Sequence, residues 1–70
     1  MQNIFIHKTE LAQAYFPLIN LRSARHNLMR MINSNPELLQ KLKAYGYTDT
    51  THIFSPRQLE LIFEYLGNPF

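Results

Sequence analysis

The sequence contains no cysteine and only two glycines in 70 residues. Without cysteine the chain has no disulfide framework, no thiolate zinc site and no cysteine nucleophile. Every apolar run is shorter than the roughly 18 residues of a membrane span. Met1–Lys8 also lacks the basic stretch followed by an apolar stretch that marks a signal peptide. These absences predict a cytoplasmic protein with no membrane partner.

Charge is sparse as well. Seven Lys and Arg stand against five Asp and Glu, which gives a net charge of +2. A strong nucleic-acid binder usually carries more positive charge, so the distribution of the cations matters more than their number. Hydrophobic residues make up 46% of the chain, enough to exclude disorder. At this length residues 1–70 are expected to form one domain, with a core too small to provide more than a few kcal/mol.

The first half of the chain predicts a strand, a short helix and a longer helix. Residues 3–7 are β-branched and aromatic, which is typical of a strand. A helical pattern over 9–15 must end before Pro17, which cannot lie inside a helix. After a turn over 16–20, a second helix is predicted over 21–33. The apolar arc of this second helix is expected to face the core through Leu21, Ala24, Leu28, Met31 and Ile32.

A third helix is predicted over 36–45. Asn35 and the residues around it offer an N-cap, a proline in the first helical position and an acid in the first turn. Gly46 supplies the left-handed stop, and the polar residues 47–51 form a connection. The residues that this helix is expected to bury are Leu38, Leu39, Leu42 and Tyr45.

The last part of the chain predicts a strand over 52–54 and a fourth helix over 56–66. Ser55 and Gln58 have the spacing of a capping box, and Gly67 ends the helix. Two strands this short must pair to be stable. The fold predicted is a mostly helical α+β domain in the order β-α-α-α-β-α, with a helix-turn-helix-like core and a short two-stranded antiparallel sheet.

No combination of residues predicts catalysis. The five acids are scattered over four elements, whereas a catalytic carboxylate pair must converge in a cleft. His7, His26 and His52 lack the His-x-x-x-His spacing that puts two metal ligands on one helix face. Both glycines look like helix stops, so no glycine-rich phosphate loop is present. We therefore expect a non-enzymatic protein with no metal, no cofactor and no small-molecule substrate.

The outer face of the helix over 21–33 is the most informative local feature. A short helix, a turn and a basic second helix are the parts of a helix-turn-helix, in which the second helix enters the major groove of double-stranded DNA. Any amphipathic helix also needs a solvated face, so the alternative that these residues only contact water stays open. The candidate DNA-contacting residues on this helix are Arg22, Ser23, Arg25, His26, Asn27 and Arg30. The candidate additional phosphate contacts are Lys8, Lys41 and Lys43.

A second candidate surface is apolar. The helix over 56–66 carries more apolar side chains than a short helix of a small domain usually needs. These side chains could either complete the core of a monomer or contact a partner, and small domains often use such residues in a symmetric homodimer. The candidate interface residues are Leu61, Tyr65, Met29 and Phe70.

Several short motifs along the whole chain carry a family resemblance. They are Glu-Leu-Ala-x-x-Tyr-Phe-Pro over 10–17, Gly-Tyr over 46–47, Phe-Ser-Pro-x-Gln over 54–58 and Leu-Gly-x-Pro over 66–69. In these motifs the sequence resembles a family of small uncharacterised proteins, a domain of unknown function found mainly in Bacteroidetes. The resemblance implies a small α+β fold and a bacterial cytoplasmic protein, without a known activity.

Residues 9–33 are also similar to the start of MerR-like and excisionase-like DNA-binding domains. The similarity consists of the Glu-Leu-Ala segment, a turn and a basic helix. It implies a recognition role for Arg22, Arg25 and Arg30. Those domains often have a Gly-Val-Ser-like turn, whereas this chain has Phe-Pro-Leu-Ile-Asn over 16–20.

Overall fold

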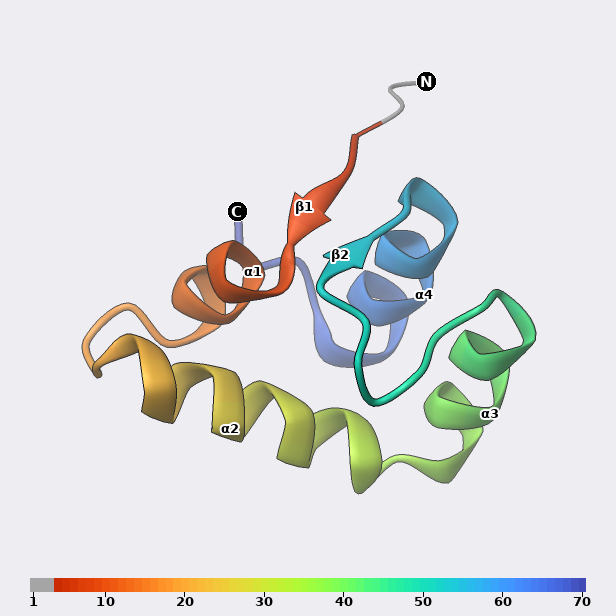
Figure 1. Ribbon diagram of the computed structural model, residues 1–70, viewed down its shortest axis with the longest axis horizontal. Helices are drawn as coiled ribbons and strands as arrows, with labels where there is room; N and C mark the ends of the chain where they lie inside the picture. Colours follow the sequence, from red (N-terminus) through yellow and green to blue (C-terminus); the bar gives the residue numbers. More distant parts are fainter. Residues whose placement is uncertain (1–3) are drawn as a thin grey trace.

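The computed structural model describes residues 4–70, and over that range it contains four helices and one two-stranded sheet (Figure 1). The elements in chain order are β1 (Ile6–His7), α1 (Lys8–Tyr15), α2 (Leu21–Asn33), α3 (Pro36–Ala44), β2 (Ile53–Phe54) and α4 (Pro56–Leu66). The predicted order and the mostly helical α+β class are therefore confirmed. None of the helices in the described range has the length and apolar character needed to cross a bilayer.

The sheet is shorter than the two predicted strands. β1 and β2 pair antiparallel over two residues each, with Ile6 opposite Phe54 and His7 opposite Ile53. Asn3, the first residue of the predicted strand, lies outside the described residues. Directly after the pairing, the backbone N–H of Lys8 donates to the carbonyl of His52 at 2.7 Å. The sheet thus joins the start of α1 to the segment that precedes α4.

α2 runs along one side of the molecule, and α1 packs on its inner face (Figure 1). The helix begins where predicted because the Asn20 side chain accepts a hydrogen bond from the backbone N–H of Ser23 at 2.9 Å. Ala24, Leu28 and Ile32 recur at four-residue intervals and are fully buried. Their spacing places them in one stripe against the core, which leaves the opposite side of α2 in solvent.

Two residues of the predicted apolar arc of α2 lie outside the core. Leu21 is 42% exposed, because it is the first residue of the helix and precedes the first core contact at Ala24. Met31 is only partly buried. Met29, a candidate protein-interface residue outside the predicted apolar arc, packs against the core instead, and its sulfur accepts a hydrogen bond from the Tyr47 hydroxyl at 3.4 Å. The buried stripe is therefore turned toward the side of Met29.

The end of α3 contains the largest difference from the predicted core. Tyr45 was expected to be buried, but it follows the last residue of the helix and is 51% exposed, with the Arg57 guanidinium 5.6 Å from its ring centre. The buried aromatic is Tyr47, which is 2% exposed. Its ring stacks on that of Phe54, with 5.9 Å between centroids. The connection after α3 thus supplies a core residue.

A Schellman motif explains this exchange. Gly46 has a φ of +90°, a backbone conformation that is strained for other residues. The N–H of Gly46 donates to the carbonyl of Lys43 at 3.1 Å, and the N–H of Tyr47 donates to that of Leu42 at 3.0 Å. This pair of bonds reverses the chain and returns the residue after the glycine to the helix surface. An apolar side chain in that position is a signal in the sequence that could have identified Tyr47 as core.

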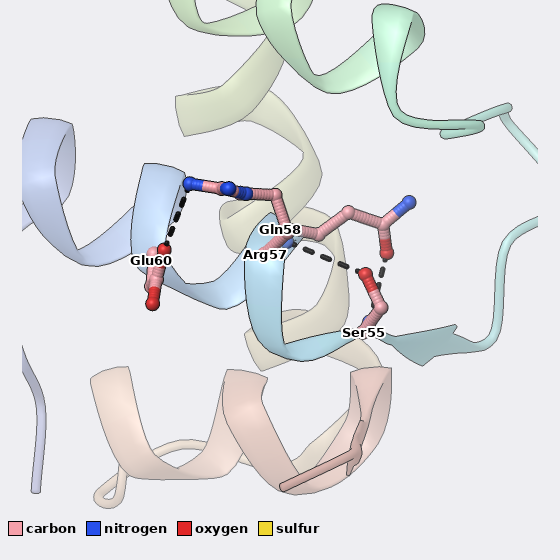
Figure 2. A network of polar contacts seen from close by, with 4 residues as sticks. All are labelled: Ser55, Arg57, Gln58 and Glu60. Atoms are coloured by element: carbon pink, nitrogen blue, oxygen red, sulfur yellow. Dashed lines mark hydrogen bonds and ion pairs between the residues drawn. The ribbon is translucent and has the colours of Figure 1, made fainter. Parts of the chain in front are cut away.

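α4 begins with the predicted capping box, shown in Figure 2. The Ser55 N–H donates to Oε1 of Gln58 at 2.9 Å, and the Gln58 N–H donates to Oγ of Ser55 at 3.4 Å. Gln58 is buried, and its Nε2 also donates to the carbonyl of Tyr45 at 2.8 Å. One side chain therefore satisfies the start of α4 and a carbonyl at the end of α3.

Replacing Gln58 should destabilise the domain. For Gln58→Ala we expect a loss of about 1–2 kcal/mol in the free energy of unfolding, because both the capping acceptor and the buried donor disappear. Gln58→Glu keeps the acceptor for the Ser55 N–H but sets a carboxylate against the Tyr45 carbonyl at pH 7. Protonation below pH ~4 restores a donor, so the deficit of this variant relative to wild type should shrink there in urea unfolding. An equal deficit at both pH values would contradict the dual role.

Tyr15 joins the end of α1 to the end of α4, since its hydroxyl donates to the carbonyl of Gly67. Burial raises the pKa of Tyr15 from 10.0 to about 12. The folded chain therefore keeps this proton after the unfolded chain has lost it. The resulting contribution to stability is complete below pH 10 and is lost as the pH rises to about 12.

We expect Tyr15→Phe to cost about 1 kcal/mol at pH 7 through loss of the hydrogen bond. The fall in melting temperature between pH 9 and pH ~11.5 should also be smaller in Tyr15→Phe than in wild type, because the phenylalanine has no proton to lose. Part of the fall should remain, since burial also raises the pKa of Tyr47. Identical alkaline profiles for the two proteins would contradict this assignment.

Candidate nucleic-acid interface

An open basin of about 750 Å³ lies along α2. α2 supplies most of its lining, the first residue of α1 contributes from one side, and the loop between α3 and β2 contributes from another. In Figure 1 α1 and this loop both lie over the same side of α2. The residues that line the basin are Lys8, Arg22, Ser23, Arg25, His26, Asn27, Met29, Arg30 and Asp49.

Most of the predicted DNA-contacting residues meet in this basin. All six candidates on α2 line it, and so does Lys8. Helical spacing brings Arg22, Arg25, His26 and Arg30 together, because residues three and four apart share one face. Lys41 and Lys43 do not line the basin. They belong to α3, where Lys41 pairs with Glu37 at 3.7 Å and lies 5.2 Å from the centre of the Tyr65 ring.

The basin is a concentration of positive charge. Four of the seven Lys and Arg line it, and Asp49 is its one acidic residue. Ion pairs elsewhere use two of the other three cations: Lys41 with Glu37, and Arg57 with Glu60 at 3.4 Å (Figure 2). Over residues 4–70 these are the two ion pairs within 4.0 Å, so no basin cation belongs to one.

Lys8 differs from the arginines of the basin because its side chain is buried. Only 4% of the residue is exposed, and its backbone N–H is held by the His52 carbonyl. Burial, and then the nearby Arg25, lower the pKa of Lys8 below its usual value, while Asp49 opposes them. The structure therefore keeps a cation where burial and a like charge both disfavour one.

Asp49 is a basin residue that the sequence did not single out. It belongs to the loop that follows Tyr47, and this loop is braced by its threonines. The N–H of Thr48 donates to Oγ1 of Thr51 at 2.9 Å, and the hydroxyls of Thr48 and Thr50 lie 3.1 Å apart. A single acid in a polar connection carries no local signal of a partner on α2, so only the tertiary structure reveals its position.

The four candidate protein-interface residues are distributed over different surfaces. Met29 lines the basin. Leu61 and Tyr65 are partly buried against the core. Phe70 is exposed and packs edge-to-face on Phe63, with 6.3 Å between ring centroids. Phe70 also borders an apolar groove of about 480 Å³ between the β1 segment, α4 and the C-terminal tail. The groove is lined by Ile4, Phe5, Ile6, Glu10, Pro56, Leu59, Glu60, Phe63, Asn68 and Phe70.

Within the described residues, no three or more His, Cys, Asp or Glu side chains are grouped as metal ligands. Comparison with curated proteins returned no match, and comparison with solved structures returned none either. A family model described as a domain of unknown function (DUF4248) matches residues 2–69. This match spans nearly the whole chain, which therefore belongs to that family of domains of unknown function.

Proposed function

We propose that this chain is a non-enzymatic DNA-binding protein whose α2 faces the duplex. The observation that carries the proposal is the gathering of four cations around one face of α2, none of them in an ion pair within residues 4–70. Phosphate neutralisation supplies much of the affinity of proteins for DNA. A local excess of positive charge provides this neutralisation even though the net charge of the chain is only +2.

The charged residues of α2 are all basic, which favours a DNA-binding face over an ordinary solvated face. α3 and α4 each carry acids and bases, and each contains an ion pair between neighbouring turns. The 13 residues of α2 include three arginines and no acid. A face adapted only to water has no need to exclude carboxylates, whereas a face that approaches phosphates does, because like charges across an interface are costly.

The dimensions of α2 also suit the major groove. Thirteen residues span about 20 Å at 1.5 Å per residue, and the groove of B-DNA is ~12 Å wide and admits a helix. The packing of α1 on the buried side of α2 resembles the support that the first helix gives in a helix-turn-helix. In this arrangement the arginines contact phosphates or guanine edges, and Ser23, His26 and Asn27 contact the backbone or base edges.

The test is binding to a mixed-sequence duplex by fluorescence anisotropy over a range of salt concentrations. Replacing Arg25 and Arg30 together by alanine should weaken binding at least tenfold at low salt. It should also reduce the slope of log K against log salt by about 2 if both contact phosphates. The matched control replaces Lys41 and Lys43 by alanine, which removes the same charge from α3 and should change binding much less. Absence of wild-type binding at low salt, or equal losses in both double variants, would refute the proposal.

A second proposal concerns the apolar groove beside α4. Phe5 and Phe70, which are 63% and 69% exposed, stand at a groove that is itself apolar. One patch therefore offers both projecting aromatic rings and a cavity that could receive them, as a self-complementary two-fold interface requires. We propose that a second copy of the chain occupies this groove. Doubling the basic face in this way would also strengthen DNA binding.

Sedimentation velocity over a concentration series tests the homodimer. Replacing Phe5 and Phe70 together by serine should weaken self-association by at least tenfold, because the projecting rings are lost. Leu18→Ser is the control, since Leu18 is 95% exposed and does not line the groove. A wild-type chain that stays monomeric at the highest concentration, or equal weakening by Leu18→Ser, would contradict the proposed dimer.

A further inference from the structure

We propose that Lys8 and Arg25 together hold one phosphate group on the floor of the basin, beside Asp49. The inference rests on the proposed function, because it assigns this phosphate to the DNA backbone. It goes further by naming a defined anion site, formed by two elements, within a face that otherwise offers dispersed positive charge.

Convergence of two elements is the first argument. Lys8 is the first residue of α1, and Arg25 lies in the second turn of α2, yet both line the same basin. No buried polar side-chain atom within residues 4–70 lacks a hydrogen-bond partner, and the Lys8 ammonium donates no hydrogen bond to those residues. The ammonium is therefore not sealed in the protein, although the rest of the side chain is almost fully covered. Lys8 is also one of the residues that line the basin.

Charge imbalance is the second argument. Arg25 is close enough to lower the pKa of Lys8, and Asp49 is close enough to raise it. The partly desolvated Lys8 thus has one guanidinium and one carboxylate near it. Such a cluster is costly by itself, because burial and like charge both oppose the ammonium. A phosphate supplies the missing negative charge and accepts hydrogen bonds from both groups.

Rigidity is the third argument. The stem of Lys8 is buried, and its backbone N–H is fixed by the His52 carbonyl at 2.7 Å. A held ammonium loses little conformational freedom when it binds, in contrast to the exposed lysines of α3. Asp49 lies at the same place and competes with an incoming anion. Removal of the Asp49 charge should therefore strengthen the binding of a phosphate group.

The experiment compares Lys8→Met, which keeps an apolar stem and removes the charge, with Lys41→Met on α3 as the matched control. For a mixed-sequence duplex we expect Lys8→Met to lower the affinity about threefold to tenfold at low salt and the salt slope by about 1. Lys41→Met should change neither by as much. Asp49→Asn should raise the affinity about threefold. Without ligand, Lys8→Met should melt no lower than wild type, because a disfavoured charge is gone.

A thermal-shift series with inorganic phosphate, against sodium chloride at equal ionic strength, separates the sources of the anion. If the duplex binds and Lys8→Met behaves like Lys41→Met, the site is refuted and the proposed DNA binding stands. If wild type binds no duplex, the assignment to DNA is refuted along with the proposed function. Stabilisation by phosphate that is lost in Lys8→Met would then support the same site with free phosphate as its source. Equal stabilisation of both variants by phosphate would refute the site.

Discussion

The reversal of the chain at Gly46 is the constraint on which most of the remaining structure depends. Two backbone hydrogen bonds at the end of α3 require a positive φ at this residue, and they direct Tyr47 into the core, where it stacks on Phe54. That contact sets the course of the following loop, which leads to β2. The same corner presents the Tyr45 carbonyl to the Gln58 amide. Core, sheet and the start of α4 are thus positioned by one turn.

The reversal also determines which segments reach the basin beside α2. The loop that leaves Tyr47 carries Asp49 to the basin, and β2 leads to the pairing that fixes Lys8 at the start of α1. α2 contributes arginines on one side because its apolar residues recur every four positions on the other. The basic face is therefore a local property of α2, whereas the floor of the basin is assembled from segments far apart in the sequence.

Local signals in the sequence predicted the elements well. The limits of α2 and α4 agree with the structure, because Asn20 and Ser55 cap their starts and each helix has a clear apolar stripe. Errors arose where burial depends on neighbours. Tyr45 matched the periodicity of α3 yet lies beyond its end, and Tyr47 resembled part of a polar connection yet is core. Periodicity describes one helix at a time, but coverage by other elements decides which residues are buried.

By itself the sequence determined the order of the elements, the capping residues and the arginine-rich face of α2, since each of these follows from residues within one helical turn or one turn motif. The tertiary structure alone decided that Lys8 and Asp49 meet that face, that Lys41 and Lys43 stay apart from it, and that Phe70 borders a groove. The physical reason is that these relations depend on how α1, α3 and the loop pack against α2. No short-range pattern encodes such contacts, because they form between residues that are distant along the chain.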